Sequence, residues 1–192
     1  MGSYLKEASR MHEAGNDLAA VALLTQALTQ GHNRTEALRM RAMLFHDMGC
    51  LKEAEDDVDL LLAEGESQAT EDLLLLKAVL RLAHHDIPSA ITYYNKAKER
   101  HPLCGQAYVG LSTAYSERRQ LDLALSVMDE ALRLLPDFAE GYKERGRIRF
   151  MLHDRDGAMD DLKQALRLSP ETGKDVEGLF TNLSGPEENR PA

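Results

Sequence analysis

The stretch LSVMDEALRLLP, residues 125–136, decides the fold because the chain repeats it. ITYYNKAKERHP ends 34 residues before it and MDDLKQALRLSP ends 34 residues after it, so Pro102, Pro136 and Pro170 fall in step. Each phrase carries apolar or small residues at helical spacing and stops at a proline, which cannot continue a helix. A period of this length indicates an array of helical repeats.

Small residues extend this period over most of the chain. One column holds Ala20, Ala54, Ala90, Ala124 and Ala158. A second column, twelve residues earlier, holds Ala8, Ala42, Ala78, Ser112 and Gly146. Two helices approach closely only where the facing side chains are small. We therefore predict two packed helices in each repeat, with larger apolar side chains filling the space between the small ones.

A helix–turn–helix repeat with these columns resembles the tetratricopeptide repeat family. The resemblance is carried in the last repeat by Tyr142, Gly146, Ala158, Leu162, Ala165 and Pro170, and in the repeat before it by Tyr108, Leu111, Tyr115, Ala124, Ala131 and Pro136. It implies an all-α fold, a right-handed α-solenoid of five helix–turn–helix units. The expected units are residues 1–34, 35–70, 71–104, 105–138 and 139–172.

The segment that follows the last repeat is amphipathic. Val176, Leu179, Phe180 and Leu183 form an i, i+3, i+4, i+7 stripe. An open stack exposes the apolar face of its final repeat, so we predict a short capping helix at residues 173–183. Residues 1–183 then form a single array, and the polar residues 184–192 form a disordered tail.

The turn inside each repeat has its own signals. Gly15 and Gly49 suit a left-handed helix C-cap, whereas His85, Arg119 and His153 hold that place in the other repeats. Asp86 and Asp154 precede second helices and are predicted N-caps.

Composition excludes several classes of function. The 192 residues carry a net charge of −9, which is unsuited to general binding of a nucleic-acid backbone. The apolar run at residues 73–83 contains Lys77 and Arg81 and is too short to cross a bilayer, so we predict no membrane insertion. The first fifteen residues contain no apolar leader region, and we expect a cytoplasmic protein.

No pattern in the sequence argues for catalysis, and we predict neither enzymatic activity nor a cofactor. His84 and His85 are separated from His101 and Cys104 by the length of a helix, so a shared metal ion is not expected. Cys50 and Cys104 match no zinc or disulfide pattern and are interpreted as reduced thiols.

The resemblance implies that the first helix of each repeat lines a concave groove that holds an extended or helical peptide. Thirteen side chains are expected to face it: Arg39, Met40, Met43, His46, Leu75, Leu76, Val79, Leu82, Val109, Thr113, Ser116, Lys143 and Arg147. The centre of this set is apolar and its flanks are charged. An exposed apolar patch usually marks an interaction site. We therefore predict a scaffold, adaptor or co-chaperone-like module that binds an apolar or amphipathic segment of another protein.

Two alternatives stay open at this point. Neighbouring first helices could simply pack against these apolar residues. A second copy of the chain could instead close the groove, which would make the protein a homodimer or a larger structural assembly.

One activity of the resembled family is not expected. Members that hold the acidic C-terminal tails of cytosolic chaperones need Lys and Asn at the fifth and ninth positions of a repeat. Here those positions hold Arg39 and Met43 in the second repeat, and Leu75 and Val79 in the third. We predict no carboxylate clamp.

Two further departures concern charge. Arg41, Lys77 and Arg145 occupy the seventh position of their repeats, where the family prefers an apolar residue, and the sequence offers no obvious partner. The acidic run EAEDDVDLLLAEGE, residues 53–66, is interpreted as a solvated outer face, with a patch for a basic partner as the alternative.

Overall fold

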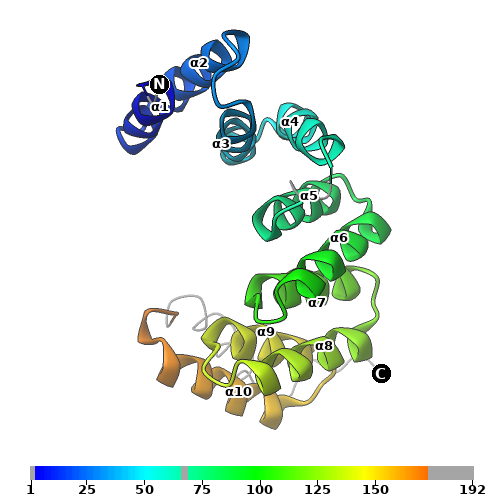
Figure 1. Ribbon diagram of the computed structural model, residues 1–192. Helices are drawn as coiled ribbons and strands as arrows, with labels where there is room; N and C mark the ends of the chain where they lie inside the picture. Colours follow the sequence, from blue (N-terminus) through cyan, green and yellow to red (C-terminus); the bar gives the residue numbers. More distant parts are fainter. Residues whose placement is uncertain (1–2, 66–68, 173–192) are drawn as a thin grey trace. The chain divides into compact units, whose positions relative to one another are not determined.

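The computed structural model describes residues 3–65 and 69–172 (Figure 1). Internal contacts divide the chain into two compact units, Met1–Arg100 and His101–Ala192. We call them the N-terminal part and the C-terminal part and describe each by itself.

The N-terminal part is built from three helical hairpins. In chain order its helices are α1 (Ser3–Glu13), α2 (Asp17–Thr29), α3 (Arg34–Asp47), α4 (Leu51–Ala63), α5 (Glu71–Ala83) and α6 (Ile87–Arg100). The hairpins are α1 with α2, α3 with α4, and α5 with α6 (Figure 1). Helix α2 also packs on α3, and α4 on α5, so each hairpin contacts the next.

The C-terminal part continues the pattern with two hairpins. They comprise α7 (Gly105–Glu117) with α8 (Leu121–Leu134), and α9 (Ala139–Met151) with α10 (Arg155–Leu168), followed by the 3-10 helix η2 (Pro170–Thr172). Because the residues that the structure describes form helices and no strand, the predicted all-α class is confirmed.

The small-residue columns lie where helices meet. The five alanines of the first column are fully buried, as are Ala8, Ala42, Ala78 and Ser112 of the second. Gly146 shows how tight the approach is, because a Cβ there would lie 3.1 Å from Leu162 Cδ2 and 3.2 Å from the Ala158 carbonyl oxygen. The predicted role of these columns in close helix packing is confirmed.

The turn inside every hairpin uses the left-handed conformation, whatever the residue type. Gly15 and Gly49 have φ of 73° and 76°, while His85, Arg119 and His153 have φ of 59°, 60° and 64°. The left-handed region is costly for residues with a Cβ. The three repeats that lack glycine at this turn therefore differ in the side chain but keep the same backbone conformation.

Side-chain caps start several second helices. Asp86 Oδ1 accepts from Ser89 N at 3.3 Å, and Asp154 Oδ1 accepts from Gly157 N at 3.0 Å, as predicted. Asn16 caps α2 in the same way through Ala19 N, at 3.2 Å. Each bond satisfies a backbone N–H that the helix itself leaves without a partner.

The basic residues at the seventh position, which had no assigned partner in the sequence, pair with acids on second helices. Arg41 donates to both Asp57 oxygens, at 2.8 and 2.7 Å, and to Thr25 Oγ1 at 2.8 Å. Arg145 repeats this geometry on the Asp161 carboxylate. The guanidinium group of Arg41 therefore ties α3 to α4 and to α2, and that of Arg145 ties α9 to α10 and to α8.

Lys77 is a variant of the same device. Its side chain is 1% exposed, and its ammonium group contacts Glu55 Oε1 at 2.9 Å and Asp59 Oδ1 at 2.5 Å. Both acids lie on α4, so Lys77 ties α5 to the preceding hairpin. A buried ammonium requires such partners.

The predicted capping helix at 173–183 and tail at 184–192 lie outside the described residues. Across residues 3–65 and 69–172, no helix combines the length and the apolar character that crossing a bilayer requires.

Candidate peptide-binding surfaces

The candidate residues of the N-terminal part lie on α3 and α5, which contact each other. Met43 and Val79 occupy the same position in these two helices, and both are exposed, at 51% and 37%. Met40, Leu76 and Leu82 are half-buried. The two exposed apolar side chains are the part of this set that a partner could contact without any rearrangement.

Two of the four apolar candidates on α5 belong mainly to the core. Leu75 is only 8% exposed. Leu76 packs against the cluster that contains Leu38, Val58 and Leu80. Core packing therefore accounts for Leu75 and Leu76, and Val79 and Leu82 are left as the more accessible pair. Whether any of them binds a peptide stays a prediction.

The polar candidates on α3 have acidic neighbours on the same helix. Arg39 Nε lies 4.0 Å from Glu36 Oε2, and His46 Nδ1 lies 3.0 Å from Asp47 Oδ1. Arg39 Nε is buried, and it has no hydrogen-bond partner within residues 3–65 and 69–172. Glu36 offsets the positive charge of Arg39, and Asp47 adds a negative charge beside Met43, so this surface offers little attraction to an acidic ligand.

The acidic run of α4 is only partly the solvated face that the sequence suggested. Glu53, Asp56 and Glu64 are exposed, but three other acids pair with bases on α3 and α5. Asp57 is buried against Arg41, and Lys77 binds Glu55 and Asp59. Glu55 also contacts Arg81 at 3.0 Å and His84 at 3.6 Å. Burial works to raise the pKa of Glu55, but the hydrogen bond and charge of Lys77, with Arg81 and His84, leave the pKa lowered. At these positions the run pairs with α3 and α5.

The candidate residues of the C-terminal part lie on α7 and α9, which also contact each other. Arg147 donates to Glu144 Oε1 at 2.6 Å and to Oε2 at 2.8 Å, and buried Ser112 donates to the same carboxylate at 3.2 Å. The hydrogen bond to Glu144 is the main cause that raises the pKa of Arg147. Lys143 lies 2.8 Å from Glu140. The basic candidates on α9 thus form local ion pairs.

The other candidates on α7 are mostly covered. Ser116 is buried, and its hydroxyl has no hydrogen-bond partner in the part of the chain that the structure describes. Val109 packs against the cluster around Tyr108 and Met128, and Thr113 is half-buried.

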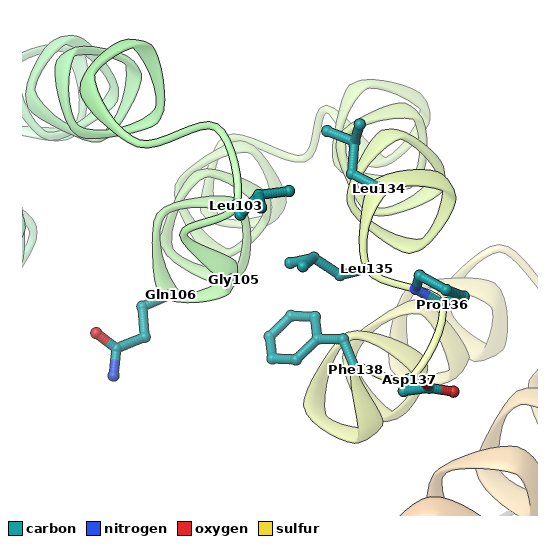
Figure 2. Close-up of a pocket in the computed structure, with 8 residues that line it drawn as sticks. All are labelled: Leu103, Gly105, Gln106, Leu134, Leu135, Pro136, Asp137 and Phe138. Atoms are coloured by element: carbon teal, nitrogen blue, oxygen red, sulfur yellow. The ribbon is translucent and has the colours of Figure 1, made fainter.

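A pocket of about 450 Å³ lies between the start of α7 and the turn that joins α8 to α9 (Figure 2). Its walls are apolar and comprise Leu103, Gly105, Leu134, Leu135, Pro136 and Phe138. Figure 2 shows the Phe138 ring and the leucines around one space, with Gln106 and Asp137 at its edges and their polar ends directed outward. We call this the Phe138 pocket.

Two glycines make room for the Phe138 ring. A Cβ on Gly105 would lie 2.6 Å from Phe138 Cζ, and a Cβ on Gly141 would lie 2.5 Å from Phe138 Cδ1. Real Cβ atoms do not approach a ring so closely, so both positions require glycine while the ring stays in place.

The sequence did not identify this pocket, although it contains a signal for it. Phe138 is the N-cap of α9 and makes no capping hydrogen bond, whereas Ser, Thr, Asp and Asn are the residues preferred there. A large aromatic residue at an N-cap, with a glycine three residues later, indicates that packing outweighs capping at that turn.

Relatives of known name match parts of the chain. Hsp70-Hsp90 organizing protein 3 of Arabidopsis thaliana is 27% identical over 92 residues, which are 48% of this chain and 16% of that protein. Hsc70-interacting protein 1 of Drosophila melanogaster is 31% identical over 129 residues, which are 66% of this chain and 34% of that protein. The chain thus spans about one sixth and one third of the lengths of these relatives.

A solved structure shares the fold at low sequence identity. The crystal structure of YrrB, described as a TPR protein with an unusual peptide-binding site, superposes with a TM-score of 0.68 at 19% identity, covering 92% of this chain and 90% of that one. The family model described as tetratricopeptide repeat matches residues 75–137 and 109–172, which together make up just over half of the sequence. The chain belongs to the tetratricopeptide repeat family.

Proposed function

We propose that the chain is a non-catalytic interaction scaffold that binds an apolar or amphipathic segment of another protein on the first helices of its repeats. The observation that carries the proposal is the exposure of Met43 and Val79 at one equivalent position on two contacting helices. Exposed apolar patches usually mark interaction sites. The flexible side chain of Met43 can adapt to partners of different shape.

The family relationship supports the same role. The relatives above are named for organizing Hsp70 and Hsp90 and for interacting with Hsc70, and YrrB is described by a peptide-binding site. An expected cytoplasmic location fits this role and is part of the proposal.

The surface on α3 and α5 favours an apolar ligand over an acidic one. Glu36 lies beside Arg39 and Asp47 lies beside His46, so the positive charge of Arg39 near Met43 is offset. A ligand would gain mainly from burying Met43 and Val79, and burial of apolar area is worth about 25 cal/mol per Å².

The test begins with peptides selected from a random library on the wild-type protein, whose Kd is then measured by fluorescence anisotropy. We expect the double variant Met43→Lys with Val79→Lys to weaken binding by about tenfold or more, since apolar burial is lost on both helices. Leu60→Lys is the matched control, because Leu60 is 45% exposed but lies on the second helix α4. Leu75 is avoided, since a charge at this buried position would unfold α5.

Equal loss of affinity in both variants, or none in the double variant, would place the site elsewhere. Light scattering on the peptide-free protein tests the alternative that a second copy of the chain covers this surface. A dimer that the double variant converts to a monomer would show that another copy covers this surface, contrary to the proposal.

A further inference from the structure

We propose that the Phe138 pocket is a second docking site, which takes one large apolar side chain of a peptide that carries Lys or Arg beside that side chain. The pocket lies between the start of α7 and the turn that joins α8 to α9, at residues distinct from those on α3 and α5. The inference therefore holds whether or not the proposed function is correct.

The first step is that the pocket is apolar and open. Leu103 forms one wall and is 53% exposed, and Leu134, Leu135 and Phe138 are only half-buried. A volume of about 450 Å³ falls within the range of about 300–1,000 Å³ that ligand pockets occupy. A pocket of this size can hold a large apolar side chain together with part of its backbone.

The second step is that two glycines, in the first turns of α7 and α9, lie against one aromatic ring. Phe138 is an N-cap without a capping bond, as are the N-caps of α3, α4, α5, α7 and α8, so the glycines set this place apart. Glycine in a helix is less favourable than alanine by up to about 1 kcal/mol. Native chains concentrate such departures at functional or strained sites.

The third step identifies the charge of the ligand. The carboxylate of Asp137 lies at the edge of the pocket and is exposed, and no hydrogen bond or ion pair involves it among the residues that the structure describes. Of the residues that the structure describes, no basic one lines the pocket. A ligand whose apolar side chain enters the pocket would therefore gain from a cation placed over Asp137, and an acid there would be repelled. The net charge of −9 adds a weaker attraction in the same direction.

The fourth step concerns the opposite edge, where the Gln106 side chain extends outward. An amide can donate to and accept from a peptide backbone. The pocket thus combines an apolar centre, an acid on one side and an amide on the other, which is the mixture that fixes the orientation of a bound peptide.

The test uses defined peptides and the full chain labelled with ¹⁵N. The probe is a short acetylated and amidated peptide with Phe-Lys-Arg at the centre of a Gly-Ser background. Matched peptides replace Lys-Arg by Glu-Glu or replace Phe by Ala. We expect amide shifts centred on Gly105, Leu135, Asp137 and Phe138 with the basic peptide, and much weaker shifts with the other two.

Variants assign the two components separately. Leu103→Ser is expected to weaken binding by about tenfold through lost apolar burial. Asp137→Asn is expected to weaken it by about two- to fivefold, the value of an exposed ion pair, and to reduce its dependence on salt. Leu123→Ser and Asp122→Asn are the controls, since both residues are exposed on α8 and neither lines the pocket.

Shifts that avoid the pocket, or that persist in Leu103→Ser, would overturn the site. Equal binding of the Glu-Glu peptide would overturn the basic ligand. Because the variants on α3 and α5 leave this pocket intact, failure here and failure of the proposed function give different results.

Discussion

Arg145 on α9 donates two parallel hydrogen bonds to Asp161 on α10, from Nε to Oδ2 at 2.8 Å and from Nη2 to Oδ1 at 2.7 Å. In the N-terminal part, Arg41 on α3 and Asp57 on α4 form the same bidentate pair, and they too are 16 residues apart in the sequence. The hydrogen bond to Asp161 is the main cause that raises the pKa of Arg145 above its usual value. Arg145 is therefore charged at any pH at which the protein is folded.

We predict that Arg145 and Asp161 are strongly coupled. In a double-mutant cycle of Arg145→Gln and Asp161→Asn, the interaction free energy should be about 1–3 kcal/mol, because the pair is bidentate and Asp161 is buried. The pair of Lys163 and Asp160 on α10, 3.8 Å apart and exposed, should couple by less than about 0.5 kcal/mol. Urea denaturation measures both values, and equal coupling in the two pairs would contradict the prediction.

We predict that removing the charge of Lys77 destabilises the protein less than removing the charges of its two acidic partners. Lys77→Met keeps the volume of the buried side chain and should change the free energy of unfolding by less than about 1.5 kcal/mol. The double variant Glu55→Gln with Asp59→Asn leaves the buried ammonium without acids, and should cost about 3 kcal/mol, the low end for such pairs since Asp59 is half exposed. A larger loss in Lys77→Met would refute this account.

The pKa of Glu55 fixes the pH dependence of this contribution. Because the pKa is lowered on folding, the stabilisation is complete above the ordinary value near 4.5 and is lost as the pH falls toward the pKa of the folded state. The difference between wild type and the double variant, measured by denaturation along a pH series, should therefore shrink only in acid.

Gly105→Ala should destabilise the protein because of Phe138 and not because of glycine flexibility. The added Cβ overlaps the ring, and such overpacking costs about 1–3 kcal/mol. In a Phe138→Ala background the overlap disappears, so the same substitution should then cost less than about 0.5 kcal/mol. Gln106→Ala is the control in the same turn. Thermal unfolding of the four variants decides, and additive costs would show that the ring and the glycine are independent.

Arg119→Gly should stabilise the protein by about 1 kcal/mol, because it relieves a left-handed backbone at φ 60°. The neighbouring Arg118 has φ −81°, so Arg118→Gly gains nothing there and should be neutral or destabilising. The midpoint of urea denaturation distinguishes the two variants. A loss of stability in Arg119→Gly would mean that the arginine side chain makes a contact worth more than the strain.

Acidic C-terminal peptides of the chaperone type should bind poorly, although the relatives are named for Hsp70, Hsp90 and Hsc70. On α9 the basic residue Arg147 is already paired with Glu144, which would repel a carboxylate. Isothermal titration with a short acidic peptide should show no binding at micromolar concentration. Tight binding that requires the free terminal carboxylate would contradict this prediction.

The sequence predicted what depends on periodicity. Pro102, Pro136 and Pro170 fixed the repeat length, and buried Ala54 and Ala158 confirm where the helices touch. These features are local and recur in each repeat, so an ambiguous position in one repeat can be assigned from the equivalent positions in the others.

What the sequence did not predict depends on contacts between distant residues. Leu75 was expected to face a ligand and Lys77 had no assigned partner, yet both are buried. Their burial depends on α4, whose acids supply partners that no spacing rule on α5 reveals. The Phe138 pocket has the same origin, because its ring meets Gly105 from the preceding hairpin.

The double attachment of Arg145 has a consequence for how the array opens. Arg145 also donates to Asp129 on α8, at 2.8 Å, so it keeps an acidic partner when α10 detaches. Among the described residues, α10 packs mainly on α9 and η2, whereas α9 packs on α7, α8 and α10, so α10 is held by fewer elements and opens more readily. A fluctuation that releases α10 therefore leaves Arg145 paired with Asp129, whereas Arg149 loses its partner Asp161. We expect hydrogen exchange to report early, reversible opening of α10 while α9 stays docked on α8.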